Sequence, residues 1–112
     1  MSVPRKRPRV TTGYTERVKT GCGSLFVTVN RDEEGIVEVF STIGHTGQCA
    51  IAQMEGLCRI ISIAIRSGVD ISSLVSQLKG IRCPSTFRDG EIEVLSCADA
   101  IASVLEKEVK ES

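Results

Sequence analysis

The sequence has little of the material from which hydrolytic active sites and nucleic-acid surfaces are usually built. It contains one histidine, His45, and no tryptophan. No Ser/His/Asp or paired-carboxylate arrangement is present, which argues against an independent hydrolase. The 14 basic and 14 acidic residues cancel to a net charge of zero, whereas general binders of nucleic acid or membrane surfaces carry a basic excess. We therefore identify no candidate catalytic residue and expect no general affinity for polyanions.

Long apolar runs are missing as well. The longest apolar stretch, within Leu57–Ile65, is interrupted by Arg59 and Ser62 and is too short to span a bilayer. No apolar run of the length of a secretory signal follows the basic N-terminus. We therefore expect a cytoplasmic protein that has no membrane partner. In that reducing compartment the five cysteines are expected to be free, metal-bound or redox-active rather than joined in structural disulfides.

The order of the segments that are present predicts one small domain of the α+β class. The length of 112 residues suits a single modest hydrophobic core. Three segments have the alternation or the β-branched and aromatic content of strands: Tyr14–Lys19, Leu25–Val29 and Ile36–Phe40. A glycine-rich turn separates the first two segments and an acidic turn separates the last two. We therefore expect a small antiparallel sheet of about three strands.

Helical spacing of apolar residues marks Ala50–Gly68 as the central buried helix, on which we expect the sheet to pack. Ile60 and Ile63 widen the apolar stripe of this helix beyond one face, so we expect it to be buried on two sides. Arg59 and Arg66 are expected to cap helix ends or to pair with nearby acidic residues such as Glu55.

Two further helices are predicted in the second half of the chain. Asp70 is an expected N-cap for a helix over Ile71–Lys79, and Ser96 can cap a last helix over Ala98–Lys107. Between these helices we expect two turns and one short strand. The turns are Ile81–Ser85 and Arg88–Gly90, and the strand is Glu91–Leu95.

The two ends of the chain are expected to lie outside the folded domain. Residues 14–108 form the predicted domain, residues 1–13 a basic, flexible arm, and residues 109–112 a tail. The arm reads Pro-Arg-Lys-Arg-Pro-Arg at positions 4–9. This pattern is typical of a solvated linker, but it also resembles a nuclear-localisation or nucleic-acid patch. We favour the linker and keep a nucleic-acid role as the weaker alternative.

Four of the five cysteines occupy similar positions. Cys22, Cys49, Cys83 and Cys97 each neighbour Gly, Pro, Ser or Gln in an expected turn or helix start. Metal-ligating cysteines favour such places, because tight turns expose the sulfur and nearby N–H groups stabilise the thiolate. However, no Cys-x-x-Cys knuckle is present, and the 26, 33 and 13 intervening residues differ from those of common zinc ribbons. Three alternatives stay open: a metal site, buried cysteines that pack as small hydrophobes, and a thiol relay. Cys58 stands apart at helical spacing in the central helix and is expected in the core.

The loop before the central helix carries two glycines, Gly44 and Gly47. Backbone N–H groups at a helix start attract anions, so this loop could hold a phosphate with Arg82 as an added charge. It lacks the length and the lysine of a P-loop. Gly44, Gly47 and Arg82 are therefore weak candidates for a nucleotide site. His45 in the same loop is expected to be an exposed residue rather than a metal ligand.

Five segments, in order, carry a resemblance to a known family. They are Thr20–Asn30, Glu38–Phe40, Arg59–Gly68, Gln77–Pro84 and Leu95–Ala102. The series resembles the TSCPD domain found near the C-terminus of adenosylcobalamin (vitamin B12)-dependent ribonucleoside-diphosphate reductases, and it covers about residues 7–106. The Gly-Ile-Arg-Cys-Pro and Ser-Cys-x-Asp-Ala turns are its most specific parts. In the family's name motif, Thr-Ser-Cys-Pro-Asp, Leu95 and Ala98 replace the threonine and the proline.

The resemblance implies an accessory role in deoxyribonucleotide synthesis for DNA. The family is known for four cysteines, which by position are Cys22, Cys49, Cys83 and Cys97, and this implies a thiolate-bound metal such as zinc. The implied partner is the catalytic chain of the reductase, in cis or in trans, and adenosylcobalamin would act only through that chain. Reductase catalysis needs a large barrel with a thiyl-radical cysteine, which 112 residues cannot contain. The alternatives are a thiol relay within the reductase and a module that associates with a nucleotide or nucleic acid.

Overall fold

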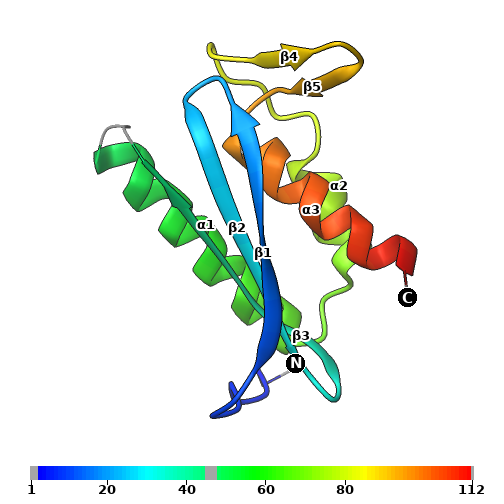
Figure 1. Ribbon diagram of the computed structural model, residues 1–112. Helices are drawn as coiled ribbons and strands as arrows, with labels where there is room; N and C mark the ends of the chain where they lie inside the picture. Colours follow the sequence, from blue (N-terminus) through cyan, green and yellow to red (C-terminus); the bar gives the residue numbers. More distant parts are fainter. Residues whose placement is uncertain (1–2, 45–47, 112) are drawn as a thin grey trace.

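The computed structural model describes residues 3–44 and 48–111. Its first half is a three-stranded antiparallel sheet of order β1-β2-β3 (Figure 1). The strands are β1 (Thr12–Thr20), β2 (Gly23–Asp32) and β3 (Gly35–Ile43). Each contains one of the three predicted strand segments and extends it at its ends. The sheet predicted from alternation and β-branched content is therefore confirmed.

Alternation along β2 divides the sheet into two faces. Leu25, Val27 and Val29 are fully buried, whereas Phe26 between them is 41% exposed, because successive side chains of a strand point to opposite faces. The pattern changes in β3, where a register shift opposite Asn30 and Arg31 leaves Val37 without a partner on β2. This bulge brings four consecutive β3 residues, Ile36–Val39, into buried positions.

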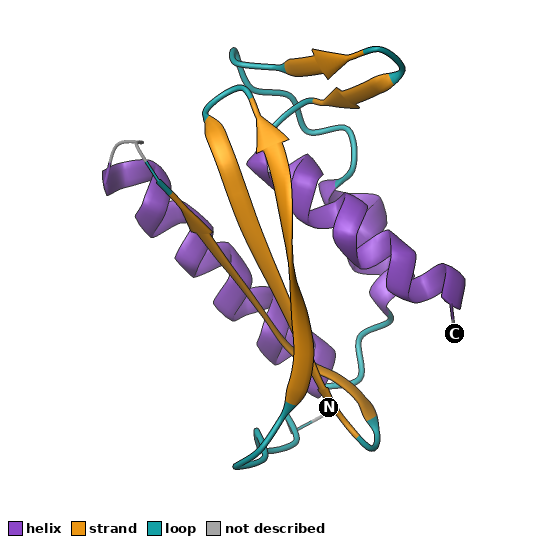
Figure 2. Cartoon of the chain, in the orientation of Figure 1, coloured by secondary structure: helices purple, strands orange, loops and turns teal. Residues whose placement is uncertain are grey.

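Three helices complete the fold. They are α1 (Gln48–Arg66), α2 (Ile71–Leu78) and α3 (Cys97–Glu111). Helix α1 runs alongside β3, while α2 and α3 pack together on the other side of the sheet, where α3 contacts β1 and β2 (Figures 1 and 2). The predicted α+β class is confirmed. No helix in the described part of the chain is long and apolar enough to cross a membrane.

The prediction that α1 is buried on two sides is wrong. Ile60 is 67% exposed and Ile63 is 47% exposed. The reason is that α1 packs against the edge strand β3, so its opposite side receives no cover from the described residues. The most deeply buried helix is α3, in which five residues are fully buried: Ala100, Ile101, Ala102, Val104 and Leu105.

A small second sheet lies near the β1–β2 turn (Figure 1). It is a hairpin of β4 (Phe87–Asp89) and β5 (Ile92–Val94). The sequence correctly predicts β5 but places a turn at Arg88–Gly90, whereas the first two of these residues belong to β4 and the turn begins at Gly90, whose φ is +62°. Strand β4 was missed because its three residues contain one apolar side chain.

The basic arm contacts the β2–β3 hairpin. Arg5 pairs with Asp32, with Nη1 2.6 Å from Oδ2, and its backbone N–H donates to the carbonyl oxygen of Arg66 at 2.9 Å. Arg7 pairs with Glu38, with Nη2 3.0 Å from Oε2. Two of the four basic side chains in the arm are therefore neutralised by carboxylates of the sheet. The predicted flexibility of the arm stays a prediction.

Candidate functional site

The β1–β2 turn, which carries Cys22, is shaped by a threonine hydroxyl. Oγ1 of Thr20 accepts the N–H of Cys22 at 3.1 Å and donates to the carbonyl oxygen of Gly23 at 2.8 Å. The turn approaches the loop before β4 very closely. A Cβ atom on Gly21 would lie 2.0 Å from the carbonyl oxygen of Ser85. Only glycine at position 21 therefore allows these two segments to meet.

Cys97 is the first residue of α3, and the helix cap around it fixes its position. Oγ of Ser96 accepts the N–H of Asp99 at 3.0 Å, as an N-cap residue does. The carboxylate of Asp99 accepts the N–H of Leu95 at 3.1 Å and the N–H of Gly80 at 2.9 Å. The Ser-Cys-x-Asp turn thus joins the end of α2 to the start of α3, with Cys97 between its two capping residues in the sequence.

Three of the four predicted site cysteines converge at this end of the sheet. The N–H of Cys83 donates to the carbonyl oxygen of Leu95 at 3.0 Å, which holds the loop before β4 against the start of α3. Burial raises the pKa of the half-buried Cys97 thiol, the neighbouring Cys22 and Cys83 raise it further, and a hydrogen bond with Thr20 lowers it. We call Cys22, Cys83 and Cys97 the thiol cluster.

Cys49 is the second residue of α1 and is exposed. It follows residues 45–47, which lie outside the described part of the chain together with the predictions for His45 and Gly47. Gly44 lies beside the β1–β2 turn, since a Cβ atom on Gly23 would be 3.5 Å from the Gly44 carbonyl oxygen. The interactions described for the thiol cluster do not include Cys49.

The thiol cluster suits a metal in its chemistry but not in its arrangement. Thiolates are soft ligands that favour zinc and similar metals. Within residues 3–44 and 48–111, no group of three or more His, Cys, Asp or Glu side chains has the arrangement of a metal site. The three thiols are neighbours without being in ligand positions. The four-cysteine metal site therefore stays a prediction.

The candidates for a nucleotide site remain equally untested. Gly44 is exposed at the end of β3, and Arg82 is exposed in the loop between α2 and β4. Gly47 is not among the described residues. The predicted nucleotide site stays a prediction.

A second polar arrangement joins α1 to the free edge of β3. Oγ of Ser62 accepts the N–H of Val39 at 2.9 Å, and Nη1 of Arg66 donates to the carbonyl oxygen of Val37 at 2.9 Å. These backbone groups point away from β2, towards the side of β3 on which a further strand would otherwise pair. Side chains of α1 thus occupy an edge that proteins usually protect from other strands. We call this contact the α1–β3 seam.

Regular spacing explains why one helix can follow one strand along the seam. A step of four helical residues advances about 6 Å, and a step of two strand residues advances about 6.6 Å. The facing pairs are Cys58 with Ser41, Ser62 with Val39, and Arg66 with Val37. Cys58 is 3% exposed, which confirms its predicted place in the core. The polar spacing i, i+4, i+8 was the available signal for the seam, but in the sequence alone Ser62 is equally well explained as an interruption of an apolar run.

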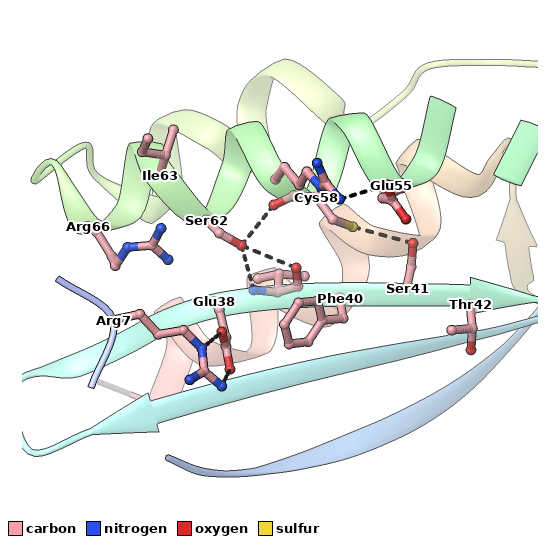
Figure 3. Close-up of a pocket in the computed structure, with 12 residues that line it drawn as sticks. Arg7, Glu38, Phe40, Ser41, Thr42, Glu55, Cys58, Ser62, Ile63 and Arg66 are labelled. Atoms are coloured by element: carbon pink, nitrogen blue, oxygen red, sulfur yellow. Dashed lines mark hydrogen bonds and ion pairs between the residues drawn. The ribbon is translucent and has the colours of Figure 1, made fainter. Parts of the chain in front are cut away.

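A cavity of about 610 Å³ opens beside the seam, between β3 and α1 (Figure 3). The strand contributes Phe40 and Thr42 to its lining, and the helix contributes Ile63 and Arg66. Arg59 and Glu55 also line it and pair with each other, with Nη2 3.0 Å from Oε2. The predicted pairing of Arg59 with Glu55 is confirmed.

Glu38 forms the charged end of this cavity and is only 2% exposed. Burial by itself raises the pKa of a carboxyl group, but hydrogen bonds from Arg7 and Asn30, together with the positive charges of Arg7 and Arg66, more than offset this effect. The pKa of Glu38 is therefore lowered overall, and its carboxylate is ionised at neutral pH. Nδ2 of Asn30 lies 2.7 Å from Oε2 of Glu38.

Comparison with protein families identifies the domain. The family model of the TSCPD domain matches residues 2–109. The chain belongs to the TSCPD family. No curated protein and no solved structure gives a significant match. The matched range includes the thiol cluster, the helix cap at Ser96 and the α1–β3 seam, so all three are parts of the TSCPD domain.

The motif that gives the TSCPD family its name has a clear structural role in this chain. Its aspartate, Asp99, is 5% exposed and bonds to two backbone N–H groups, as described above. Its serine, Ser96, is the helix cap and also donates to the carbonyl oxygen of Ile81 at 2.6 Å. These two residues hold the loop that carries Cys83 and the helix that begins at Cys97. The motif therefore positions two thiols of the TSCPD domain.

Proposed function

We propose that this TSCPD domain is an accessory module of the adenosylcobalamin-dependent ribonucleoside-diphosphate reductase system. In this proposal it binds the catalytic chain of the reductase, in cis or in trans, and takes no catalytic step itself. Support comes from the family match over residues 2–109. The described residues fold into one small α+β domain, whereas reductase chemistry needs a much larger barrel, and this favours a binding role for the domain. Adenosylcobalamin would bind to the partner and would supply the radical there.

The proposal includes a metal held by Cys22, Cys49, Cys83 and Cys97, with zinc as the best match for four sulfur ligands. The observation that carries it is the convergence of three of these thiols from separate segments: the β1–β2 turn, the loop before β4 and the start of α3. A bound metal would join these segments and stabilise a small domain.

Metal analysis of the full chain, prepared without added metal, tests this part of the proposal. We expect about one zinc or similar ion per chain, as for a single four-thiolate site, and its loss in Cys83→Ser and Cys97→Ser. Cys58→Ala is the matched control, because Cys58 is buried in the seam and should leave the metal content unchanged. A folded, metal-free protein with four reactive thiols would rule the metal out.

A thiol relay is the second candidate, and the proximity of Cys22 to Cys97 favours it. In a relay, two cluster thiols would reduce a disulfide of the reductase by exchange. The two thiols would end as a new disulfide, and their protons and two electrons would pass to the reductase sulfurs. Incubation of the metal-free chain with oxidised and reduced thioredoxin separates the two candidates. Reversible formation of one disulfide supports the relay, and four thiols that never pair exclude it.

Binding to the reductase is tested directly with a purified catalytic chain that lacks its own TSCPD domain. We expect a complex in size-exclusion chromatography and a higher rate of deoxyribonucleotide formation when this chain is added. Failure to bind would contradict the accessory role. Salt-sensitive DNA binding that disappears when residues 1–9 are deleted would instead favour the nucleic-acid alternative.

A further inference from the structure

We propose that the cavity beside the α1–β3 seam binds a small molecule that combines a flat ring with an anionic group. Its volume of about 610 Å³ falls within the range of about 300–1,000 Å³ that is typical of ligand sites. None of its lining residues belongs to the thiol cluster. The proposal therefore stands apart from the role in the reductase system and does not depend on it.

The ring is inferred from two apolar side chains that border the cavity. Phe40 on β3 is 48% exposed and Ile63 on α1 is 47% exposed, so the strand and the helix each contribute one apolar side chain to the lining (Figure 3). A flat ring that contacts these two side chains would remove apolar surface from water. Phe26 provides a contrast, because it is 41% exposed on the same face of the sheet but does not line the cavity.

The anionic group is inferred from the charges. Three arginines and two glutamates line the cavity. Arg7 pairs with Glu38, and Arg59 pairs with Glu55. Arg66 forms no ion pair with a carboxylate among the described residues, and one of its five N–H donors binds the carbonyl oxygen of Val37. The C-terminal dipole of α1 offsets only about half a charge, so the wall keeps a positive excess that suits an anion.

The positions along α1 give the ligand its dimensions. Arg59 and Arg66 are seven residues apart on one side of the helix, which places their Cα atoms about 10 Å apart. Ile63 lies between them. A ring against Ile63 would therefore hold a sulfonate, carboxylate or phosphate within reach of Arg66 at one end or Arg59 at the other.

The seam itself argues against a peptide strand as the occupant. A peptide that adds to a sheet needs free N–H and C=O groups on the edge strand. Ser62 and Arg66 already bind those groups at Val39 and Val37. The groups that remain available to a ligand are the apolar walls and the guanidinium group of Arg66. These groups favour a small molecule.

The test uses a fluorescent probe of this chemistry, 8-anilinonaphthalene-1-sulfonate, with the full chain. Its neutral counterpart, N-phenyl-1-naphthylamine, has the same rings without the sulfonate. We expect one sulfonate probe to bind per chain, and to bind about tenfold more tightly than the neutral probe, as one charge-assisted hydrogen bond predicts. Titration by fluorescence gives both dissociation constants.

Matched variants locate the binding. Phe40→Thr should weaken binding of both probes, whereas Phe26→Thr removes a similarly exposed ring outside the cavity and should leave the affinity unchanged. Arg66→Gln should weaken the sulfonate probe about tenfold and leave the neutral probe unaffected. Arg17→Gln is the charge control on β1. Urea unfolding of each variant establishes that it is folded.

Three outcomes would overturn the proposal. Equal losses in Phe40→Thr and Phe26→Thr would mean that the probe adheres to exposed apolar surface in general. Equal affinity for the two probes would show that the cavity does not recognise the anionic group. A dimer in sedimentation experiments that dissociates on Phe40→Thr and excludes the probe would show that a second copy of the chain covers the cavity instead.

Discussion

Among single residues, Ser62 shows how a polar side chain is accommodated in an apolar helix. It is 6% exposed, and its hydroxyl lies between the N–H of Val39 and the carbonyl oxygen of Cys58, 2.8 Å away. No buried side-chain nitrogen or oxygen of the described residues lacks a hydrogen-bond partner. A buried backbone N–H that loses its partner is expensive, so position 62 needs a small hydrogen-bond acceptor.

We predict that Ser62→Ala destabilises the domain by about 1–3 kcal/mol, because the N–H of Val39 would be buried without an acceptor. Urea unfolding followed by circular dichroism measures the change in the free energy of unfolding. Ser76→Ala is the control, since Ser76 is an exposed helical serine whose hydroxyl donates to the carbonyl oxygen of Ser73. Equal stability of the two variants would mean that water replaces the Ser62 hydroxyl.

At the scale of elements, two glycines differ in whether another segment lies where a Cβ atom would be. Gly21 lies where the β1–β2 turn meets the loop before β4, and no space for a Cβ atom exists there. Gly56 lies in α1 with no atom near the position of a Cβ. The first glycine permits two segments of the thiol cluster to touch, whereas the second only lowers the stability of its helix.

We predict opposite effects for two Gly→Ala substitutions. Gly56→Ala should stabilise the domain by about 0.5–1 kcal/mol, because alanine restricts the unfolded chain and favours the helix. Gly21→Ala should destabilise it by about 1–3 kcal/mol, because the turn must move away from Ser85. Thermal and urea unfolding measure both changes. If Gly21→Ala left the stability unchanged, the loop before β4 would be able to shift together with the turn.

At the scale of the whole molecule, ion pairs join segments that are far apart in the sequence. Glu38 binds Arg7 of the arm, and Glu108 of α3 binds Arg31 of β2, with Nη2 2.6 Å from Oε2. Both glutamates are buried. Tyr14 also donates a hydrogen bond to Glu108 at 2.8 Å. The pKa of the tyrosine is raised mainly by burial and further by this hydrogen bond. The lowered pKa of Glu38 makes folding sensitive to acid.

We predict that Arg7→Gln makes the domain unfold at a higher pH on acidification. The folded protein lowers the pKa of Glu38 below its unfolded value of about 4.3. The stabilisation from Glu38 is therefore fully present above that pH and is lost as the pH falls through the folded pKa. Without Arg7 one cause of the lowering is removed, so the stability difference between the two proteins is largest near neutral pH.

Circular dichroism during an acid titration measures this difference. Below the folded pKa, Glu38 is protonated in both proteins, and we expect the stability difference to shrink. Arg9→Gln, at an exposed position of the same arm, is the control and should titrate like the wild type. A constant difference at every pH would show that Arg7 contributes through packing rather than through charge.

Much of this fold follows from local patterns, and the exceptions have physical causes. Alternation gives the strands, and helical spacing with capping by Asp70 and Ser96 gives the helices, because both patterns depend on neighbouring residues. Ile60 was predicted to be buried and is exposed, because periodicity does not show how many layers surround a helix. The meeting of Cys22, Cys83 and Cys97 depends on tertiary contacts, and here the family resemblance gave the grouping that spacing alone left open.

The α1–β3 seam also has a consequence for the time during which the chain is being synthesised. Strand β3 leaves the ribosome before Ser62 and Arg66 do, so a nascent chain that ends within α1 carries an uncovered strand edge. Such edges recruit other extended chains. The period of risk ends when the second half of α1 has emerged and folds back along β3. Substitutions that slow this step would lower the yield of soluble protein during synthesis even where the finished domain is stable.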